Sequence, residues 1–193
     1  MQIDTLLARR VRELRKRQGL SLDGLAQLSG VSRSMISLIE REETSPTAAV
    51  LNKLADALGV PLASLFAEEP DDAPASPLNP ASLQAVWRDP ASGYSRRHLS
   101  PGAFPSPLEL AEVSFPAGQS VTFDNPLRSM TTHQQLWLME GEMVIDLDGE
   151  CWRLHAGDCL AMVLGQRIVF HNPGAVAARY LLALTTVPAT RRN

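Results

Sequence analysis

The sequence SLDGLAQLSGVSRSMISLIE, which spans Ser21–Glu40, predicts two short helices joined by a tight turn. Leu22 and Leu25 lie at helical spacing before Gly30, a residue type that adopts left-handed backbone conformations without steric cost and so ends a helix. Ser32 can begin the second helix, because its hydroxyl can accept a hydrogen bond from a backbone N–H group. The pattern is typical of a helix-turn-helix unit, which places its second helix in the major groove of DNA.

The second predicted helix has one face suited to reading base pairs. Ile36 and Ile39 face back toward the first helix, which leaves an outward face of Arg33, Ser34, Ser37 and Leu38. Arginine can form two hydrogen bonds to guanine, serine can donate or accept, and leucine can contact a thymine methyl group. The alternative is a pair of core helices in an all-α domain. An outer face of that kind would carry Glu–Lys pairs, and it would have no reason to expose a leucine.

Across roughly Leu6–Phe66 the sequence resembles the lambda-repressor-like helix-turn-helix family, also called XRE. The resemblance is carried by LRKRQGLSLDGLA, GVSRSMISLIERE and SPTAAVLNKLADALGV, in the family's order and spacing. It implies a five-helix domain that binds an operator in double-stranded DNA. It also implies a buried ion pair between Arg15 in the first helix and Glu40 in the recognition helix, with a structural role and no DNA contact.

The other helices of this domain are predicted from apolar stripes and end signals. Leu6–Gln18 is a basic helix with a narrow apolar stripe; such a helix could lie on a membrane, but a DNA-binding unit follows it directly. Ser45 and Pro46 are predicted as the N-cap and first residue of a later helix. Leu62–Phe66 is predicted as a short fifth helix.

Helix starts present N–H groups and hydroxyls to phosphates, as expected at Ser21 and over Thr44–Thr47, while Arg41 adds a backbone contact. The predicted DNA-binding residues are therefore Ser21, Ser32, Arg33, Ser34, Ser37, Leu38, Arg41, Thr44 and Thr47. The charge distribution agrees with this assignment. Residues 1–41 contain eight basic and four acidic side chains, a net charge of +4, whereas residues 70–193 carry a net charge of −3.

The chain length of 193 residues suits two small domains. Glu68–Ser82 (EEPDDAPASPLNPAS) has four prolines, four acidic residues and no periodicity, which predicts an extended linker. The expected organisation is a DNA-binding domain at 1–67, a linker at 68–83 and a β domain at 84–193. No apolar run is long enough to span a membrane, so we expect a cytoplasmic protein with no membrane partner. Cys151 and Cys159 are interpreted as small core residues.

Short strands separated by turn residues are predicted from residue 84 onward. Asp148-Gly149 is a hairpin signal, and Asn172-Pro173-Gly174 marks another turn. Many strands at close spacing indicate a sandwich or barrel. The predicted strands are Ala85–Arg88, Tyr94–Leu99, Leu108–Phe115, Gln135–Met139, Met143–Leu147, Cys151–Leu154, Cys159–Val163, Arg167–His171 and Arg179–Thr186.

The segments FPAGQSV, WLMEGEMVIDLDGE, LHAGDCLAMVL and FHNPGAVAARYLLAL are similar to the two strand groups of a cupin, a double-stranded β-helix or jelly-roll barrel. Cupin enzymes bind a metal through two histidines and a carboxylate from the first group and a histidine from the second. The resemblance places the carboxylate position at Gln134, the paired histidines within Leu127–Met130, and the last histidine at Ile168. None of these positions has the expected ligand, and His133 and His171 fall out of register.

The sequence therefore predicts an α + β regulator with no metal, no cofactor and no enzymatic activity. It is expected to act as a homodimer and, through the cupin domain, to sense a small-molecule effector. The predicted effector-binding residues are Arg128, Met130, His133, Gln134, Leu136, Leu138, Met162, Ile168 and Phe170, most of them placed inside the barrel by strand alternation. Two alternatives remain open: a metal-dependent cupin enzyme with a DNA-binding head, and an effector-independent repressor whose barrel is filled and only structural.

Overall fold

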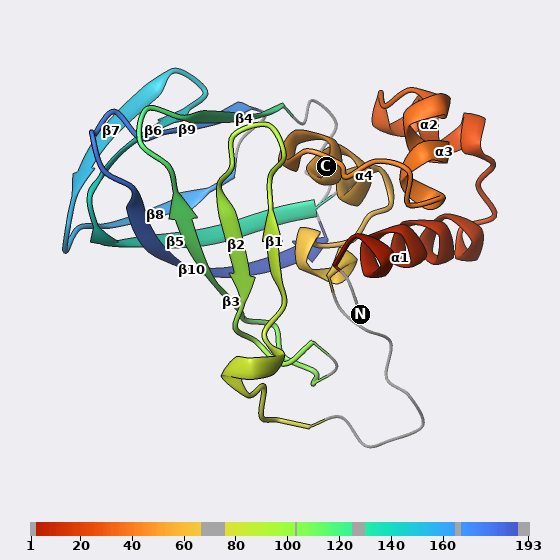
Figure 1. Ribbon diagram of the computed structural model, residues 1–193, viewed down its shortest axis with the longest axis horizontal. Coiled ribbons are helices and arrows are strands. Elements are labelled where there is room, and N and C mark those ends of the chain that lie inside the picture. The colour runs from red at the N-terminus through yellow and green to blue at the C-terminus, as the bar shows by residue number, and fades with distance from the viewer. Residues whose placement is uncertain (1–2, 67–75, 103, 125–129, 165–166, 189–193) are drawn as a thin grey trace, which may run out of the picture.

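The computed structural model describes residues 3–66, 76–102, 104–124, 130–164 and 167–188. A cluster of helices at one end of the molecule, hereafter the head, packs against a β barrel at the other end (Figure 1). The head contains the α-helices α1 (Ile3–Arg17), α2 (Leu22–Ser29), α3 (Arg33–Glu40) and α4 (Ala48–Ala57).

The helix-turn-helix unit forms as its sequence predicts. The Ser21 hydroxyl caps α2 by accepting a hydrogen bond from the Gly24 N–H at 3.0 Å, and the Ser32 hydroxyl caps α3 from Met35 at 3.2 Å. Gly30 ends α2 with a φ of 66°, in the left-handed region. The buried faces meet through an apolar set of Leu25, Ile36 and Ile39, all of which are essentially fully buried.

Two details of the predicted head are wrong. The helix after the recognition helix begins at Ala48 with Thr47 as its N-cap, because the Ser45 hydroxyl instead donates a hydrogen bond to Asp4 of α1 at 2.9 Å. The head has four α-helices and not five, since the predicted fifth helix is a single 3₁₀ turn, η1 (Leu62–Leu65). Its Ser64 N–H bonds to the Pro61 carbonyl three residues back, and the turn ends after four residues.

The barrel consists of two antiparallel sheets that face each other (Figure 1). A 3₁₀ turn, η2 (Ala81–Leu83), precedes the first strand. The strands are β1 (Val86–Arg88), β2 (Ser95–His98), β3 (Glu109–Phe115), β4 (Ser120–Asp124), β5 (Met130–Glu140), β6 (Glu142–Leu147), β7 (Glu150–His155), β8 (Cys159–Val163), β9 (Arg167–His171) and β10 (Ala178–Pro188). The larger sheet has the order β1-β2-β3-β10-β5-β8, and the smaller has the order β4-β9-β6-β7.

Strand alternation sorts the barrel residues into an interior and an outer face. The six predicted interior residues Gln134, Leu136, Leu138, Met162, Ile168 and Phe170 are all buried, as expected. The prediction for the cysteines is wrong: Cys151 and Cys159 are both exposed, because Cys159 shares the outward parity of Ala161 and Val163 on β8. Strand β4 was not predicted at all, although it pairs with β9 along its whole length.

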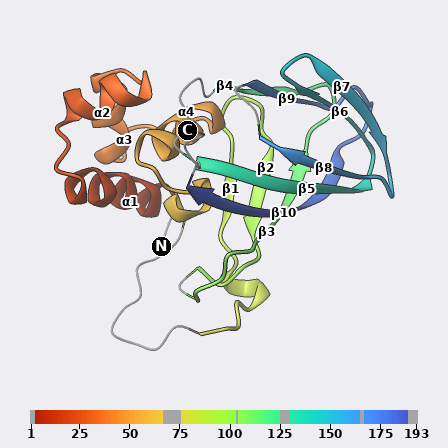
Figure 2. The ribbon, with the colours of Figure 1, turned by 180° about the vertical axis from the view of Figure 1, so that it is seen from behind.

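The head is docked against the barrel, and α4 lies between the other helices and the strands (Figures 1 and 2). The Phe66 ring at the end of the head lies 6.0 Å from Trp87 of β1 and 4.3 Å from His98 of β2, measured between ring centroids. The Ala48 N–H donates to the Asp89 carboxylate at 3.0 Å. Residues 67–75 of the predicted linker lie outside the described residues, and its described part is bonded to the barrel through Asn79.

Candidate functional site

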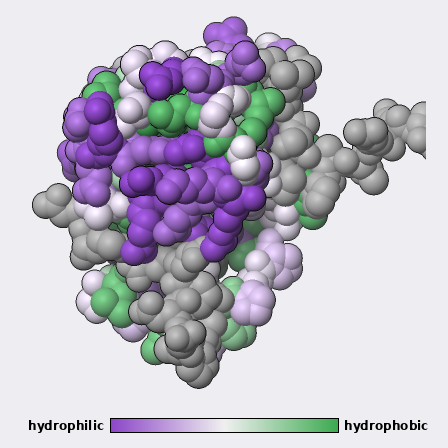
Figure 3. All heavy atoms as spheres, turned by 90° about the vertical axis from the view of Figure 1, so that its right-hand side faces the viewer, coloured by the Kyte–Doolittle hydropathy of each residue, from purple (hydrophilic) through white to green (hydrophobic). Residues whose placement is uncertain are grey.

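The outer face of α3 is available for contact with a partner. Arg33 and Ser34 are exposed, whereas Ser37 and Leu38 are partly buried. The Ser34 hydroxyl lies 3.1 Å from that of Ser32, so the start of the helix carries two adjacent hydroxyls. Figure 3 looks onto the head end of the molecule, where hydrophilic side chains surround a few apolar ones. This face combines a guanidinium group, hydroxyl groups and one apolar side chain, which are the kinds of group that contact base edges.

Both arginines predicted to contact DNA have acidic neighbours in the free protein. Arg33 Nε lies 3.3 Å from Asp23 of α2, and Arg41 Nε lies 3.1 Å from Glu43. All four side chains are more than half exposed. Surface pairs of this kind contribute at most about 1 kcal/mol, so a guanine or a phosphate can replace the carboxylate partner.

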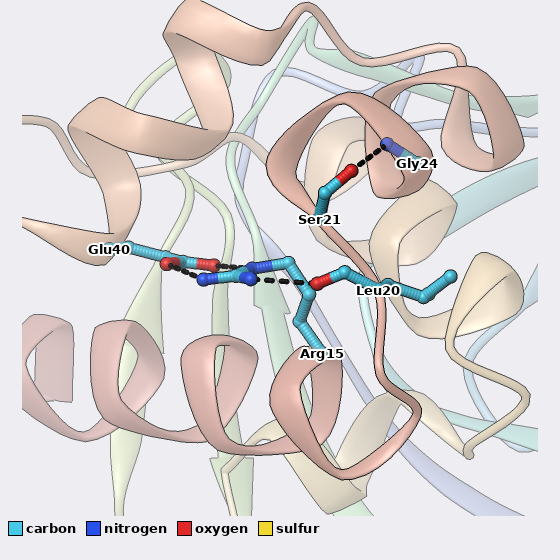
Figure 4. Close-up of polar contacts among 5 residues, drawn as sticks. All are labelled: Arg15, Leu20, Ser21, Gly24 and Glu40. Carbon is cyan, nitrogen blue, oxygen red and sulfur yellow. Dashed lines mark hydrogen bonds and ion pairs between the residues drawn. The ribbon is translucent and has the colours of Figure 1, made fainter.

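The ion pair implied by the family resemblance is present (Figure 4). Arg15 donates from Nε and from a terminal nitrogen to the two carboxylate oxygens of Glu40 at 2.6 and 2.7 Å, and also donates to the Leu20 carbonyl at 2.8 Å. The hydrogen bond to Glu40 raises the pKa of Arg15, and both side chains are largely buried. The pair fixes the end of α3 against α1 and orients the recognition helix.

Of the helix starts predicted to face phosphates, the one at α4 is already occupied. Thr47 caps α4 through Val50, while the Ala48 N–H of the same helix end donates to Asp89 of the barrel. A carboxylate thus lies where the prediction expected a phosphate, which weighs against a DNA contact for Thr47. Ser21 is exposed and Thr44 is partly exposed, so neither is blocked in this way.

A cavity of about 100 Å³ lies between the head and the open end of the barrel. Its wall includes Asn52 and Asp56 of α4, and Val60, Pro61 and Leu62 of the following segment. The barrel contributes an apolar and aromatic wall comprising Tyr94, Val113, Phe115, Phe123, Leu164, Ile168, Phe170, Tyr180, Leu182 and Leu184, together with the polar residues Arg96, Glu109, Thr132, Gln134 and Thr186. The cavity is therefore shared by the two domains.

Three side chains of the cavity wall have buried polar atoms without a hydrogen-bond partner among the described residues: Asn52 Nδ2, Arg96 Nε and Glu109 Oε2. Arg96 is 6% exposed, and its terminal nitrogen is 4.0 Å from Glu109 Oε2, beyond hydrogen-bonding distance. Burial raises the pKa of Glu109, and the positive charge of Arg96 opposes this rise. The six interior residues predicted from strand alternation are apolar except for Gln134, so the charged residues Arg96 and Glu109 inside the barrel were not predicted.

The predicted effector-binding residues fall into several places. Gln134, Ile168 and Phe170 line the cavity. Leu136 and Leu138 are buried but do not border it, and Met162 and His133 border a second pocket along β5, β8 and β10, which Gln134 also borders. Arg128 lies outside the described residues, and Met130 is described only as the first residue of β5.

Gln134 was predicted, but the charged residues of the cavity, Arg96 and Glu109, were missed although the sequence carried a signal for both. Glu109 has the same strand parity as the buried Ala111, Val113 and Phe115, and Arg96 is the buried position of β2. A charged residue at an inward position marks a special site, because burial of a charge is costly. Asn52 was not predictable in this way, since its role depends on how α4 docks against the barrel.

The histidines near the predicted metal positions do not lie on the inward faces of their strands. His133 is exposed on the outer face of β5, and His171 Nδ1 lies 2.8 Å from the Ser120 hydroxyl. Within the described ranges, no three side chains of His, Cys, Asp or Glu come together in a way that could hold a metal ion. The described helices include none that is both long enough and apolar enough to cross a membrane.

Comparisons with known proteins agree with this architecture. A helix-turn-helix family model matches residues 11–65. The chain is 30% identical over 178 residues to the HTH-type transcriptional regulator PuuR of Escherichia coli (strain K12), covering 92% of this chain and 93% of that protein. It is 29% identical over 174 residues to the HTH-type transcriptional regulator SutR of the same organism, covering 87% and 88% of the two chains.

A solved structure extends the likeness to the whole molecule. The crystal structure of an HTH_3 family transcriptional regulator from Vibrio cholerae superimposes with a TM-score of 0.76 at 26% identity. The match covers 97% of this chain and 98% of the other. The likeness therefore includes the barrel and the arrangement of the two parts as well as the helix-turn-helix unit.

Proposed function

Because the chain belongs to the XRE family of helix-turn-helix transcriptional regulators, we propose that it binds a specific operator as a homodimer and senses a small metabolite through its cupin-like barrel. The observation that carries the DNA-binding part is the outer face of α3. That face is polar, begins at a capped turn and is held in orientation by the Arg15–Glu40 pair. The contacts are assigned to the predicted DNA-binding residues, with Thr47 removed.

Selection of binding sequences from randomised duplexes tests this function. Substitution of two arginines distinguishes base recognition from phosphate binding. Arg33→Ala is expected to cost about 1–3 kcal/mol of discrimination at one base pair while nonspecific binding persists. Arg41→Ala is expected to weaken all sequences alike and to reduce the salt dependence of binding by about one phosphate contact. Both effects are measured by fluorescence anisotropy over a range of salt concentrations.

Asp23→Asn serves as the matched control, since it frees Arg33 from its carboxylate neighbour without removing the arginine. It is expected to leave specificity intact and to strengthen binding slightly, because one negative charge near the DNA is lost. Equal losses for Arg33→Ala at every base pair would contradict the assignment of Arg33 to a base.

A dimer is supported by the outer face of the six-stranded sheet. Trp137 of β5 is 48% exposed and Val163 of β8 is 52% exposed. Beside them, Gln135 of β5 pairs in register with Ala161 of β8 and Ala183 of β10, and these three residues line the second pocket. Leu108 extends the same apolar surface beyond the start of β3. An exposed, partly apolar face of this kind suits a two-fold contact with a second copy.

Trp137→Glu is therefore expected to weaken dimerisation by at least about tenfold, the factor that corresponds to 1.4 kcal/mol. Operator affinity should fall with it, because two half-sites need two linked heads. Val176→Glu is the control, since Val176 is 65% exposed in the turn before β10, away from this face. Sedimentation equilibrium measures the outcome, and a Trp137→Glu protein that dimerises like the control would contradict this interface.

The sensing role is supported by the cavity, which a filled structural barrel would lack. We propose no enzymatic activity, since the described residues of the cavity wall include a guanidinium, carboxylates and amides but no histidine or cysteine. Metal analysis after dialysis discriminates the enzyme alternative: a stoichiometric divalent metal would favour it.

A further inference from the structure

The cavity wall holds polar atoms that lack a hydrogen-bond partner in the described part of the chain. Asn52 Nδ2 and Arg96 Nε are donors without acceptors, and Glu109 Oε2 is an acceptor without a donor. We propose that the effector is a small α-amino acid, whose carboxylate binds Arg96 and Asn52 and whose ammonium group binds Glu109. This inference rests on the proposed sensing function and names the ligand class.

The unpaired groups are costly unless something completes them. A buried donor or acceptor without a partner costs about 1–3 kcal/mol, and more when the group is charged. Three of the five such atoms among the described residues belong to side chains that line this one cavity. Their concentration at one place points to a ligand-binding role and away from a contribution to folding stability.

The two charges select a zwitterion. A simple carboxylate would satisfy Arg96 but leave Glu109 Oε2 unpaired, and a simple amine would do the opposite. The nearest atoms of the two side chains are 4.0 Å apart, so the ligand's acidic and basic groups must also be close together. In an α-amino acid they are attached to the same carbon, whereas ω-amino acids hold them further apart.

The remaining wall sets the size and side chain of the ligand. A cavity of about 100 Å³ is somewhat smaller than one that holds benzene, so it accommodates on the order of four to six non-hydrogen atoms. Phe123, Phe170 and Leu182 provide an apolar surface for a small side chain. Asp56 also borders the cavity, but its side chain already has an interaction of its own.

The position of the cavity also gives a regulatory mechanism. Asn52 belongs to α4 of the head, whereas Arg96 and Glu109 belong to β2 and β3 of the barrel. A ligand held by all three side chains bridges the two domains and favours the docked arrangement over any other. By linkage, the ligand shifts operator affinity only to the extent that it binds this arrangement more tightly.

Calorimetric titration of the full chain with five probes tests the ligand class: L-alanine, propionate, n-propylamine, 4-aminobutyrate and 1,2-diaminoethane. L-alanine is expected to bind at least tenfold more tightly than each of the others. The class is wrong if propionate, propylamine or 4-aminobutyrate binds as well as alanine, or if no probe binds. Tighter binding of the diamine would also overturn it, because the carboxylates of Asp56 and Glu109 would then dominate recognition.

Variants identify the groups involved. Glu109→Gln is expected to weaken alanine binding at least tenfold and to remove its advantage over propionate, while Asn52→Asp should repel the ligand carboxylate. Glu112→Gln is the matched control on the outer face of β3, where it contacts Arg97 and Arg179 and not the cavity. Circular dichroism and a cooperative unfolding transition confirm that each variant is folded. Unchanged alanine binding in both cavity variants would overturn the assignment.

Operator binding measured with and without alanine separates this inference from the function on which it rests. A change of at least fivefold in operator affinity is expected, and it should disappear in Glu109→Gln but not in Glu112→Gln. Specific DNA binding without alanine binding would refute the ligand class and leave the regulator intact. Alanine binding with unchanged operator affinity would refute the bridging mechanism, and loss of both would refute the proposed function as well.

Discussion

Replacing Arg15 with methionine is expected to lower the free energy of unfolding by about 3–5 kcal/mol, because it leaves the Glu40 carboxylate buried without a cation. Arg15 provides both hydrogen bonds to that carboxylate and a third to the Leu20 carbonyl. Loss of Arg15 should also abolish specific DNA binding at urea concentrations near the midpoint of unfolding. The reason is that the Arg15–Glu40 pair holds the end of α3. Urea denaturation followed by circular dichroism measures the change.

The double variant Arg15→Met with Glu40→Leu is the control for this prediction. It removes both charges, and packed apolar side chains often replace a buried ion pair at little or no cost. The double variant should therefore be more stable than Arg15→Met alone. If the single variant loses less than about 1 kcal/mol, the pair behaves like a surface salt bridge and does not position the recognition helix.

Asp89→Ala is expected to cost about 2–4 kcal/mol of unfolding free energy, the second-largest effect. The Asp89 carboxylate is 2% exposed and accepts hydrogen bonds from the Ala48 N–H at 3.0 Å and from the N–H and hydroxyl of Ser92 at 3.0 and 2.5 Å. It also places a negative charge at the N-terminus of α4, where the helix dipole favours one.

Asp89→Asn is the matched variant, since its carbonyl oxygen can still accept one of these bonds. It should lose about half as much stability as the alanine variant. Denaturation monitored through tryptophan fluorescence suits this pair, because Trp87 lies two residues away and is buried against Phe66. A change below about 0.5 kcal/mol for Asp89→Ala would show that this contact contributes nothing to the docking of head and barrel.

The helix-turn-helix unit was predictable from sequence because its determinants are local. Gly30 ends α2 and Ser32 caps α3, and each acts only on neighbouring residues. Leu25, Ile36 and Ile39 follow helical periodicity. The start of α4 was misplaced because Ser45 is bonded to Asp4, forty-one positions earlier in the chain, and a distant partner of this kind leaves no local pattern.

The β region was predictable in outline and not in its details. Turn residues marked most strands, but β4 was missed although Val121 and Phe123 alternate with polar residues and both face the barrel interior. The strand has only five residues, so the alternating pattern is short. The proline-rich segment predicted an extended linker between the two domains. It contains no information on the Phe66, Trp87 and Asp89 contacts that join them, because those contacts depend on tertiary packing.

The shared core of α4, Phe66 and the first barrel strands limits how freely this regulator can be recombined. DNA-binding domains are commonly treated as interchangeable modules that accept any sensor. Here a chimera that joined this head to another barrel would place the Phe66 ring, now beside Trp87 and His98, in water. Evolution or engineering of new specificity in this chain must therefore conserve the interface between head and barrel or change both sides of that interface together.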